Sequence, residues 1–363
     1  MRLLHIADVH LERPFRRLEY RRGHSRRQEL RDALSRAVDS ARQYDVDALC
    51  IAGDLYEREN APPAVGEFLR ATFERLGTTP VLIAPGNHDF FAAGCLYDRV
   101  DWPPNVHVFR DPRPSPVRVA DGTVWGAAFT GPECTGSPLA GLHVSDDGPH
   151  VGLFHGQVVS DDQSSAYGPI ALSAFASTGL AFAMLGHVHG GRIDEAHGFA
   201  YPGSLEPLDV SEVGPRWGLL LTVNASGRSV ERITLAHRRV LSDEIDLSTI
   251  STVQDLRLEI DRHRTDWEGN DVRLRLYGTL QGELLAHPDS IREALLGLDV
   301  DPRLEARPAE DLDALARQQT TLGAFIREAR RLAEEAAESD RSHWEDVLVA
   351  GIAAFRGQEV ILR

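Results

Sequence analysis

The 363-residue sequence contains no lysine, and all 39 of its basic residues are arginine. A Walker A phosphate-binding loop, a Schiff-base enzyme and an ordinary protein kinase each need a lysine, so these classes are excluded. The three cysteines are widely spaced and form no C-x-x-C pair, which argues against a disulfide framework and a structural zinc site. No apolar run approaches the roughly 20 residues that a membrane-spanning helix needs. Because Met1 leads directly into a strand-like segment, we expect no signal peptide and a cytoplasmic protein.

Acidic residues outnumber basic ones, 55 to 39, and the excess is uneven along the chain. Residues 241–363 carry 26 acids and 15 arginines, whereas residues 1–240 carry 29 acids and 24 arginines. A formal net charge of -16 argues against a protein that simply coats nucleic acid. Residues 13–31 nevertheless hold eight arginines against Glu19 and Glu29. Two interpretations of this segment have equal weight: a solvated loop and helix face, or a surface that contacts a phosphate backbone.

The first 240 residues alternate between short apolar strands and amphipathic helices. Strand-like runs at 3–7, 47–52 and 80–84 are separated by helical patterns at 28–44 and 64–76. This order predicts an open α/β sheet with an active site at the carboxyl ends of its strands. Later strands are predicted at 123–128, 151–154, 182–185, 217–223 and within 230–242, and a proline-rich loop at 103–116. A sandwich of mixed sheets flanked by helices fits this pattern better than one parallel sheet.

After residue 242 the pattern changes to that of a small α+β domain, with a helix at 252–263, a strand at 271–277 and a helix at 289–296. From residue 309 the chain is helical and strongly charged, and an apolar stripe at helical spacing runs from Leu312 to Ala336. We therefore predict three parts: a catalytic domain (1–242), a capping domain (243–308) and C-terminal helices (309–363). The stripe can pack on its own domain or dock a partner.

Five short polar motifs each follow a predicted strand directly. Because strand ends meet at one edge of a sheet, we expect their side chains to converge. Carboxylate and imidazole ligands without thiolates suit manganese, iron or zinc, and two such ions clamp both oxygens of a phosphate ester during displacement. Any one motif occurs by chance, but all five at strand ends predict a metal site. The motifs are Asp8-Val9-His10, Gly53-Asp54, Gly86-Asn87-His88-Asp89, Phe154-His155-Gly156 and Gly186-His187-Val188-His189.

The order of these motifs resembles that of the calcineurin-like metallophosphoesterase superfamily, and within it the SbcD/YhaO-type DNA repair exonucleases. The opening Leu4-His5-Ile6-Ala7-Asp8, the later Tyr167-Gly168-Pro169-Ile170 and the segment Tyr201-Pro202-Gly203-Ser204-Leu205-Glu206 extend the resemblance over about residues 1–225. The resemblance implies an α/β fold: a metallophosphoesterase β-sandwich flanked by helices, with a small α+β cap domain and C-terminal helices.

The resemblance also implies the ligands of two divalent ions, most readily Mn²⁺. Asp8, His10, Asp54 and His189 would hold one ion. Asp54 would bridge to the second, which Asn87, His155 and His187 would complete. Two further residues would have catalytic roles. His88 would lie beside the scissile phosphate and protonate the leaving oxygen or stabilise its charge, and Asp89 would orient His88.

One departure from the family pattern is Glu57, three residues after Asp54, where relatives of this kind usually carry aspartate or histidine. Glu57 keeps the negative charge on a longer side chain, so it can support the metal ligands from behind or mark a differently tuned site.

The resemblance implies that the chain is a DNA exonuclease that can also act as an endonuclease. It further implies that the chain is the nuclease subunit of an SbcCD-like repair or defence complex. It would form a homodimer and bind a coiled-coil ATPase of the SbcC or YhaN kind through its C-terminal helices. Two alternatives stay open: a metallophosphatase or phosphodiesterase acting on a small molecule or phosphoprotein, and a weakly active scaffold for the ATPase. The roughly 120 residues beyond the catalytic part, which a minimal phosphatase does not need, favour the nuclease.

Overall fold

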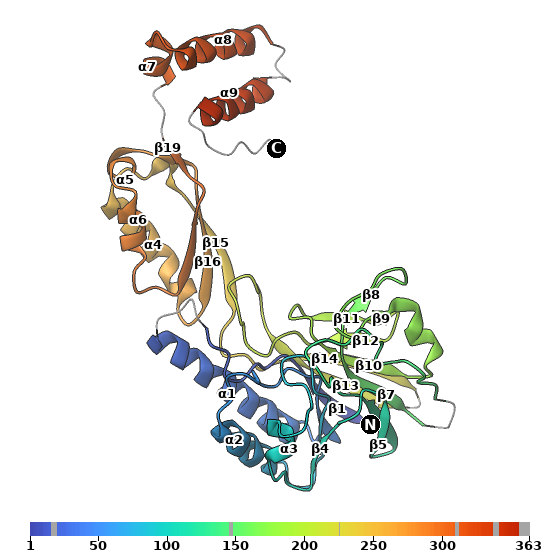
Figure 1. The fold of residues 1–363 in the computed structure, drawn as a ribbon. Helices are drawn as coiled ribbons and strands as arrows, with labels where there is room; N and C mark the ends of the chain where they lie inside the picture. The colour runs from blue at the N-terminus through green and yellow to red at the C-terminus, as the bar shows by residue number, and fades with distance from the viewer. Residues whose placement is uncertain (16–19, 145–147, 225, 309–311, 337–340, 356–363) are drawn as a thin grey trace. The chain divides into compact units, whose positions relative to one another are not determined.

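The computed structural model describes residues 1–363 except 16–19, 145–147, 225, 309–311, 337–340 and 356–363 (Figure 1). Arg16 and Arg17 of the basic segment, and parts of the predicted C-terminal helices, therefore lie outside the described residues. The chain forms two compact units. The first unit comprises residues 1–243, 266–273 and 299–301, and the second comprises 244–265, 274–298 and 302–363. The predicted division into three domains stays a prediction.

The first unit contains two six-stranded sheets, which confirms the predicted sandwich of mixed sheets. One sheet has the order β14-β13-β1-β2-β3-β4 and the other the order β11-β12-β10-β7-β6-β5. In the first sheet, β1, β2, β3 and β4 are parallel, and β13 pairs antiparallel with β1. In the second sheet, β6, β7, β10 and β12 are parallel. The bounds of the first sheet are Gly227–Thr234 (β14), Trp217–Asn224 (β13), Arg2–Ile6 (β1), Ala48–Ile51 (β2), Val81–Ile83 (β3) and Val106–Val108 (β4). Those of the second are Arg192–Asp194 (β11), Phe199–Tyr201 (β12), Phe182–Gly186 (β10), His150–His155 (β7), Gly122–Gly126 (β6) and Ser115–Val119 (β5).

Strand β1 separates two hydrophobic layers because successive side chains of a strand point to opposite faces. Leu4 and Ile6 belong to the layer under the helices, whereas Leu3 belongs to the layer shared with strands of the second sheet, such as Val151 of β7. All four side chains have no exposed surface, and burying such a side chain stabilises the fold by about 1.5–3 kcal/mol. Both faces of β1 are therefore filled, which holds its carboxyl end in a fixed place.

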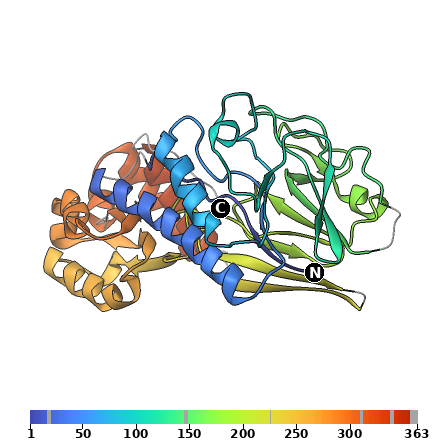
Figure 2. The same cartoon turned by 90° about the horizontal axis from the view of Figure 1, so that it is seen from below.

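Helices α1 (Tyr20–Gln43) and α2 (Pro63–Glu74) cover the first sheet, and Figure 2 shows them side by side. The apolar positions of α1 that the sequence predicts to share one face are all buried, Leu30 and Leu34 completely. The predicted start at residue 28 is wrong, since α1 begins at Tyr20. The predicted loop at 103–116 is also wrong in part, because it contains β4 and the start of β5, which forms a sheet edge where proline is tolerated.

Four short elements of the first unit lie in its connections. They are α3 (Leu96–Arg99), β8 (Val158–Val159), β9 (Ile170–Ala171) and a 3₁₀ turn at Leu172–Ser177. Strands β8 and β9 pair with each other in parallel, directly after the fourth motif.

The second unit begins within β15 (Val240–Asp246), which forms a three-stranded sheet with β16 (Asp271–Tyr277) and β18 (Val300–Leu304). In β16 the even-numbered residues Val272, Leu274 and Leu276 are buried, as the alternation in the sequence predicts. The remaining elements are a 3₁₀ turn at Leu247–Thr249, α4 (Val253–Trp267), β17 (Thr279–Leu280), α5 (Gly282–Ala286), α6 (Asp289–Ala294), β19 (Arg307–Pro308), α7 (Leu312–Arg317), α8 (Thr321–Glu335) and α9 (Arg341–Phe355). Among the described residues, no helix is long and apolar enough to span a membrane.

Candidate metal centre

The five polar motifs end five parallel strands. Asp8 and His10 follow β1, Asp54 follows β2, and Asn87 follows β3. In the second sheet, His155 ends β7, and His187 with His189 follows β10. Because these strands share one direction within each sheet, their carboxyl ends bring the seven side chains together. We call this group the metal edge: Asp8, His10, Asp54, Asn87, His155, His187 and His189.

The backbone adopts rare conformations where it enters the metal edge. Asp8, His10 and Asp54 have φ angles of 50°, 50° and 51°, and His187 has a φ of 102°. L-residues seldom adopt positive φ, and such strain persists where surrounding structure holds it, commonly at functional sites. Here the loops hold one another, since the His10 N–H donates to the Asp54 carbonyl at 2.9 Å.

Glycines allow the loops to approach closely. Gly53 has a φ of 84°, and a Cβ on it would lie 2.3 Å from Nδ1 of His155. A Cβ on Gly86 would lie 2.4 Å from Oδ1 of Asp54. A side chain at either position would therefore displace a predicted metal ligand, which explains why glycine precedes Asp54 and Asn87.

Two overlapping groups within the metal edge have the composition and spacing of metal ligands. Asp8, His10 and His189 offer atoms that lie within 4.8 Å of one another, and so do Asp8, Asp54 and His155. Asp8, His10, Asp54 and His155 are almost completely buried. Buried carboxylates facing one another need compensating positive charge, which divalent cations supply.

The histidine rings are oriented by partners behind them. Nδ1 of His10 lies 2.9 Å from Glu57, Nδ1 of His155 lies 2.9 Å from the Ala52 carbonyl, and Nδ1 of His189 lies 2.8 Å from Glu212. Since these oxygens accept hydrogen bonds, each of the three Nδ1 atoms carries a proton. Nε2 of His10 is buried without a hydrogen-bond partner. An imidazole whose Nδ1 is held in this way presents Nε2 on its other side, which is typical of a metal ligand, so the donor set fits divalent cations.

Asn87 lies between the remaining two histidines. Its Oδ1 is 3.0 Å from Nε2 of His155 and 3.2 Å from Nδ1 of His187. The ring of Tyr167 stacks on His187 with centroids 4.8 Å apart, while 38% of the surface of Tyr167 remains exposed. The structure thus joins Asn87, His155 and His187, the group that the resemblance implies for the second ion.

His88 lies at the exposed rim of the metal edge. Its backbone N–H donates to Oδ1 of Asp54 at 2.8 Å, and its Nδ1 lies 2.9 Å from Oε2 of Glu57. The hydrogen bond to Glu57 raises the pKa of His88 to about 9 against the opposing effect of partial burial. His88 therefore carries a proton near neutral pH in this arrangement.

Asp89 has contacts that differ from the expectation that it orients His88. Its carboxylate accepts from the N–H groups of Asp54, Leu55 and Gly86 at 3.2, 2.7 and 2.6 Å, and from the Tyr97 hydroxyl at 2.6 Å. Asp89 is fully buried, so it satisfies loop N–H groups that would otherwise lack partners. These contacts hold the loop that carries Asp54, and Glu57 is the carboxylate that contacts His88.

Two further carboxylates support the site: Glu57, for which the sequence left this role as one of two alternatives, and Glu212, which sequence reasoning missed. Glu57 bonds both His10 and His88, and these bonds outweigh burial and lower the pKa of Glu57. Glu212 accepts from His189, from Ser204 Oγ at 2.7 Å and from Leu208 N–H at 3.0 Å. The departure from the family pattern at position 57 had already drawn attention to Glu57. Glu212 lies six residues beyond the recognised Tyr201–Glu206 segment, and no motif marked it.

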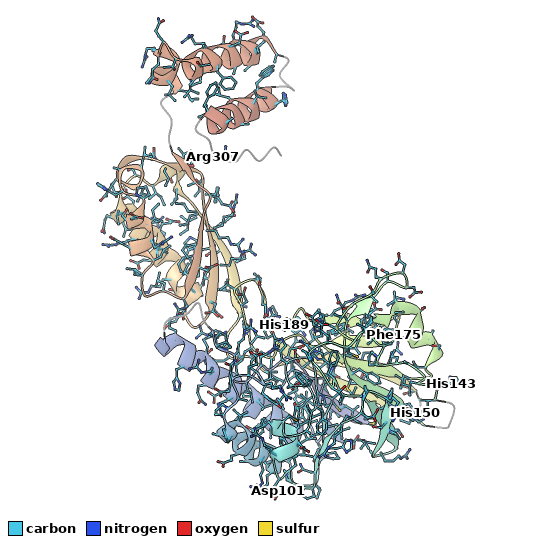
Figure 3. The ribbon with its side chains drawn as sticks, in the orientation of Figure 1. Asp101, His143, His150, Phe175, His189 and Arg307 are labelled. Atoms are coloured by element: carbon cyan, nitrogen blue, oxygen red, sulfur yellow. The ribbon has the colours of Figure 1, made fainter. Side chains whose placement is uncertain are left out.

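Histidines that match no motif lie elsewhere. His143 and His150 are separated from His189 in Figure 3. Nδ1 of His143 contacts the Ser177 carbonyl at 3.1 Å, and Nδ1 of His150 accepts from the Trp125 indole at 3.2 Å. Both have structural contacts, as the absence of a motif predicts.

Several described arginines of the basic segment pair with carboxylates of the same unit. Arg22 pairs with Asp299, and Arg31 pairs with Glu12. Arg26 pairs with Glu29 and lies 3.4 Å from Asp271. Arg238 bonds Glu29 at 2.8 Å and both aspartates at 3.2 Å. We call the group of Arg22, Arg26, Arg238, Glu29, Asp271 and Asp299 the arginine cluster.

Comparison with known proteins identifies the class to which this fold and this edge belong. Residues 1–191, more than half of the chain, match the calcineurin-like phosphoesterase family, so the chain belongs to that family. The family's fold binds two divalent metals, and the metal edge supplies candidate ligands for them. The class implied is a hydrolase of phosphate esters, as predicted.

Particular relatives confirm the resemblance to YhaO- and SbcD-type proteins. The uncharacterized metallophosphoesterase YhaO of Bacillus subtilis is 28% identical over 247 residues, covering 63% of this chain and 59% of YhaO. The DNA double-strand break repair protein Mre11 of Aeropyrum pernix is 28% identical over 273 residues, covering 68% of this chain and 64% of Mre11. The SbcD component of the nuclease SbcCD of Bacillus subtilis is 35% identical over 94 residues, covering 24% of this chain and 22% of SbcD. The matches thus span less than two thirds of each relative.

Proposed function

We propose that this chain is a DNA exonuclease that hydrolyses phosphodiester bonds with two divalent ions, most readily Mn²⁺. The relatives named as a double-strand break repair protein and a nuclease component support this substrate. The convergence of seven metal-ligand side chains with His88 at one edge carries the proposal.

The resemblance to the family assigns ligands to the two ions, and the residues present fit that assignment. Asp8, His10, Asp54 and His189 would hold the first ion. Asp54, Asn87, His155 and His187 would hold the second. When bound, the ions supply Lewis acidity to the phosphate oxygens and lower the pKa of the attacking water.

His88 has the protonation state that a general acid needs. Its raised pKa keeps the imidazole charged, and its exposed position lets it meet a substrate. We assign to it the transfer of a proton to the leaving oxygen, or stabilisation of the charge there. Glu57 holds the ring through Nδ1, which leaves Nε2 for the substrate. Asp89 acts as a positioning residue through the loop of Asp54.

The partner proposals concern the second unit and a second copy of the chain. We assign to α8 and α9 the docking of a coiled-coil ATPase of the SbcC or YhaN kind. Ile326 and Ala329 of α8 are buried, whereas 48% of the surface of Phe355 in α9 is exposed, so the hairpin packs internally and still presents apolar surface. The proposed repair or defence complex also contains a homodimer of this chain.

The test is hydrolysis of end-labelled linear duplex DNA by the full chain with Mn²⁺, with bis-p-nitrophenyl phosphate in parallel. The matched controls are His88→Asn, a metal-free sample, and His143→Asn, which changes an exposed histidine outside the metal edge. We expect shortening from the DNA ends by the wild type and by His143→Asn alone. Cleavage of the ester without cleavage of DNA would contradict the nuclease proposal and indicate a phosphodiesterase with another substrate. Metal binding without any hydrolysis would contradict it in favour of a scaffold protein.

A further inference from the structure

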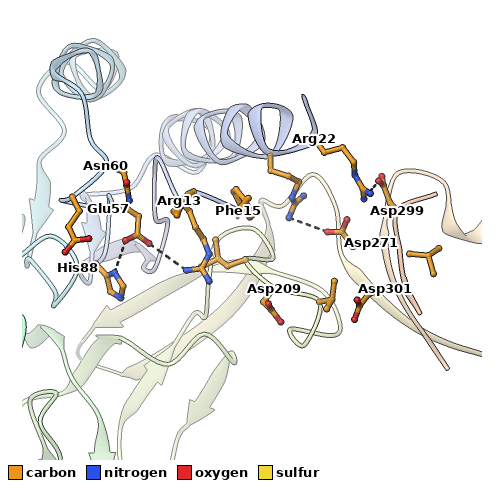
Figure 4. Close-up of a pocket in the computed structure, with 16 residues that line it drawn as sticks. Arg13, Phe15, Arg22, Glu57, Asn60, His88, Asp209, Asp271, Asp299 and Asp301 are labelled. Atoms are coloured by element: carbon orange, nitrogen blue, oxygen red, sulfur yellow. Dashed lines mark hydrogen bonds and ion pairs between the residues drawn. The ribbon is translucent and has the colours of Figure 1, made fainter. Parts of the chain in front are cut away.

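A groove of about 640 Å³ in the first unit begins beside His88 and contains three arginines of the basic segment (Figure 4). They are Arg13, Arg22 and Arg26. Glu57 and His88 line one end, and Asp271, Asp299 and Asp301 line the groove as well. The lining carries more acids than arginines, so its total charge does not suit a polyanion. What matters is which arginine each acid neutralises.

Arg22 and Arg26 are committed to structural partners. Arg22 pairs with Asp299, and Arg26, which is only 6% exposed, pairs with Glu29 and contacts Asp271. Arg26 is buried, and if it left its partners it would leave their charges unpaired inside the protein. Arg22 and Asp299 are each 39% exposed, but their ion pair is closer than the contact of Arg13 with Glu57. Both arginines therefore have closer acidic partners than Arg13 has.

Arg13 has a weaker connection to a different kind of partner. Its guanidinium lies 3.7 Å from Oε1 of Glu57, and 29% of its side chain is exposed. The same Glu57 carboxylate already accepts hydrogen bonds from His10 and His88 at 2.9 Å each. Figure 4 shows Arg13 and His88 on either side of Glu57. Because both side chains contact the carboxylate of Glu57, Arg13 and His88 lie close to each other.

The backbone fixes where Arg13 begins. Its N–H donates to the His10 carbonyl at 3.0 Å, so the residue is held by the same loop that carries two predicted metal ligands. A guanidinium stays charged at all working pH values and matches phosphate oxygens in its fork geometry. The ion pair of Arg13 with Glu57 is long, and Glu57 has two other hydrogen-bond donors, His10 and His88. Arg13 can therefore leave Glu57 for a phosphate group at a small cost in free energy.

We propose that Arg13 binds a phosphate adjacent to the scissile one, and so selects substrates with consecutive phosphodiesters over isolated phosphate esters. This inference rests on the proposed function and adds the residue that recognises a nucleic-acid strand. Glu57 then serves both groups, holding His88 at the reacting phosphate and Arg13 at its neighbour.

The experiment uses two chromogenic substrates that differ by one phosphate. These are thymidine 5′-(p-nitrophenyl phosphate) and the same compound with a 3′-phosphate. The isomeric 3′-(p-nitrophenyl) esters with and without a 5′-phosphate cover the opposite side of the scissile group. We expect the wild type to prefer the doubly phosphorylated member of one pair by about 10- to 100-fold in kcat/KM. Arg13→Gln loses that preference through KM, and Arg13→Lys retains part of it.

The matched control is Arg22→Gln, which removes the same charge from the same groove and is expected to keep the wild-type preference. An equal loss on both members of each pair would overturn the inference, since Arg13 would then act only through Glu57 and His88. An unchanged preference in Arg13→Gln would overturn it as well.

A binding measurement separates this inference from the proposed function. Fluorescence anisotropy of a labelled single-stranded oligonucleotide, with the full chain in EDTA, needs no turnover. One lost phosphate contact reduces the slope of log affinity against log salt by about 0.7 in Arg13→Gln. An unchanged slope contradicts the role of Arg13. If the slope falls but the wild type cleaves none of the substrates, Arg13 binds phosphate and the hydrolytic function is the part that fails.

Discussion

The metal edge and the arginine cluster are both groups of polar and charged side chains in the first unit, but their charges are balanced differently. The arginine cluster has three guanidiniums against three carboxylates, and its members bond one another. The metal edge places the carboxylates of Asp8 and Asp54 among imidazoles, a donor set that fits divalent cations. The charges of the arginine cluster are balanced by ion pairs within the fold, whereas we propose that bound metal ions balance those of the metal edge.

This difference indicates how a structural cluster is distinguished from a functional one. In the arginine cluster, Arg238 donates to both oxygens of Glu29 and leaves no acceptor without a donor there. In the metal edge, the buried Nε2 of His10 has no hydrogen-bond partner and lies 3.6 Å from Oδ2 of Asp54. An unpaired buried acceptor costs stability, so its presence points to a ligand.

The sharpest test of the comparison is Asp54→Asn. Removing the charge of the proposed bridging carboxylate should lower Mn²⁺-dependent hydrolysis of bis-p-nitrophenyl phosphate by roughly a thousandfold or more, because metal charge stabilisation contributes several kcal/mol. The metal-free variant should unfold in urea at nearly the wild-type concentration, since the asparagine oxygen still accepts from His88 N–H. A large loss of metal-free stability would instead make Asp54 a structural residue like those of the arginine cluster.

The opposite behaviour is expected for Arg238→Met. Its removal takes away the guanidinium that Glu29, Asp271 and Asp299 share, and leaves them only Arg26 and Arg22, which should lower the free energy of unfolding by about 3–5 kcal/mol. Urea denaturation measures this loss, and calorimetric Mn²⁺ affinity should stay unchanged. Arg75→Gln, which breaks the exposed pair with Asp39, is the control and should change stability by less than about 1 kcal/mol. Equal effects of the two variants would contradict the structural role of the cluster.

A third prediction uses a buried carboxylate outside both groups. Burial raises the pKa of Glu206 to about 7, although Arg36 and two backbone N–H groups bind its carboxylate. Because the folded state holds this proton more tightly than the unfolded chain, stability is highest below the unfolded pKa near 4.5 and falls as the pH rises through 7.

The measurement is the free energy of unfolding at pH 4.5 and pH 8. Relative to Glu206→Gln, which cannot ionise, the wild type should lose roughly 2–3 kcal/mol over this interval. A difference between the two proteins that does not depend on pH would show that Glu206 ionises normally.

The smallest expected effect concerns support of the metal edge from behind. Glu212→Gln removes the charge that fixes the His189 tautomer, and such partners are typically worth 10- to 100-fold in metal affinity. Titration calorimetry with Mn²⁺ measures the change, and Glu231→Gln, an exposed residue of β14, is the matched control. If Glu212→Gln binds Mn²⁺ with wild-type affinity, the bond to His189 is incidental.

Elements with a strong apolar pattern could be predicted from the sequence, and those held by ion pairs could not. Strand β1 and the buried face of α1 follow from the spacing of their leucines and alanines. The first turns of α1 carry Tyr20, arginines and Gly23, with no apolar period. In the structure these turns are helical, and Arg22 and Arg26 form ion pairs with Asp299 and Asp271. These two aspartates lie more than 240 residues further along the chain. No local pattern contains that information.

The site shows the same division. The pattern of the sequence placed the five motifs at strand ends, and the resemblance to the family predicted the seven residues of the metal edge and His88. Packing in three dimensions sets the contacts of Glu57 with His10 and His88, of Asp89 with the loop of Asp54, and of Glu212 with His189. These pairs join separate loops, and a hydrogen bond depends on distances of a few tenths of an ångström. Such distances are set by how the two sheets and their loops pack, which no single segment of the chain specifies.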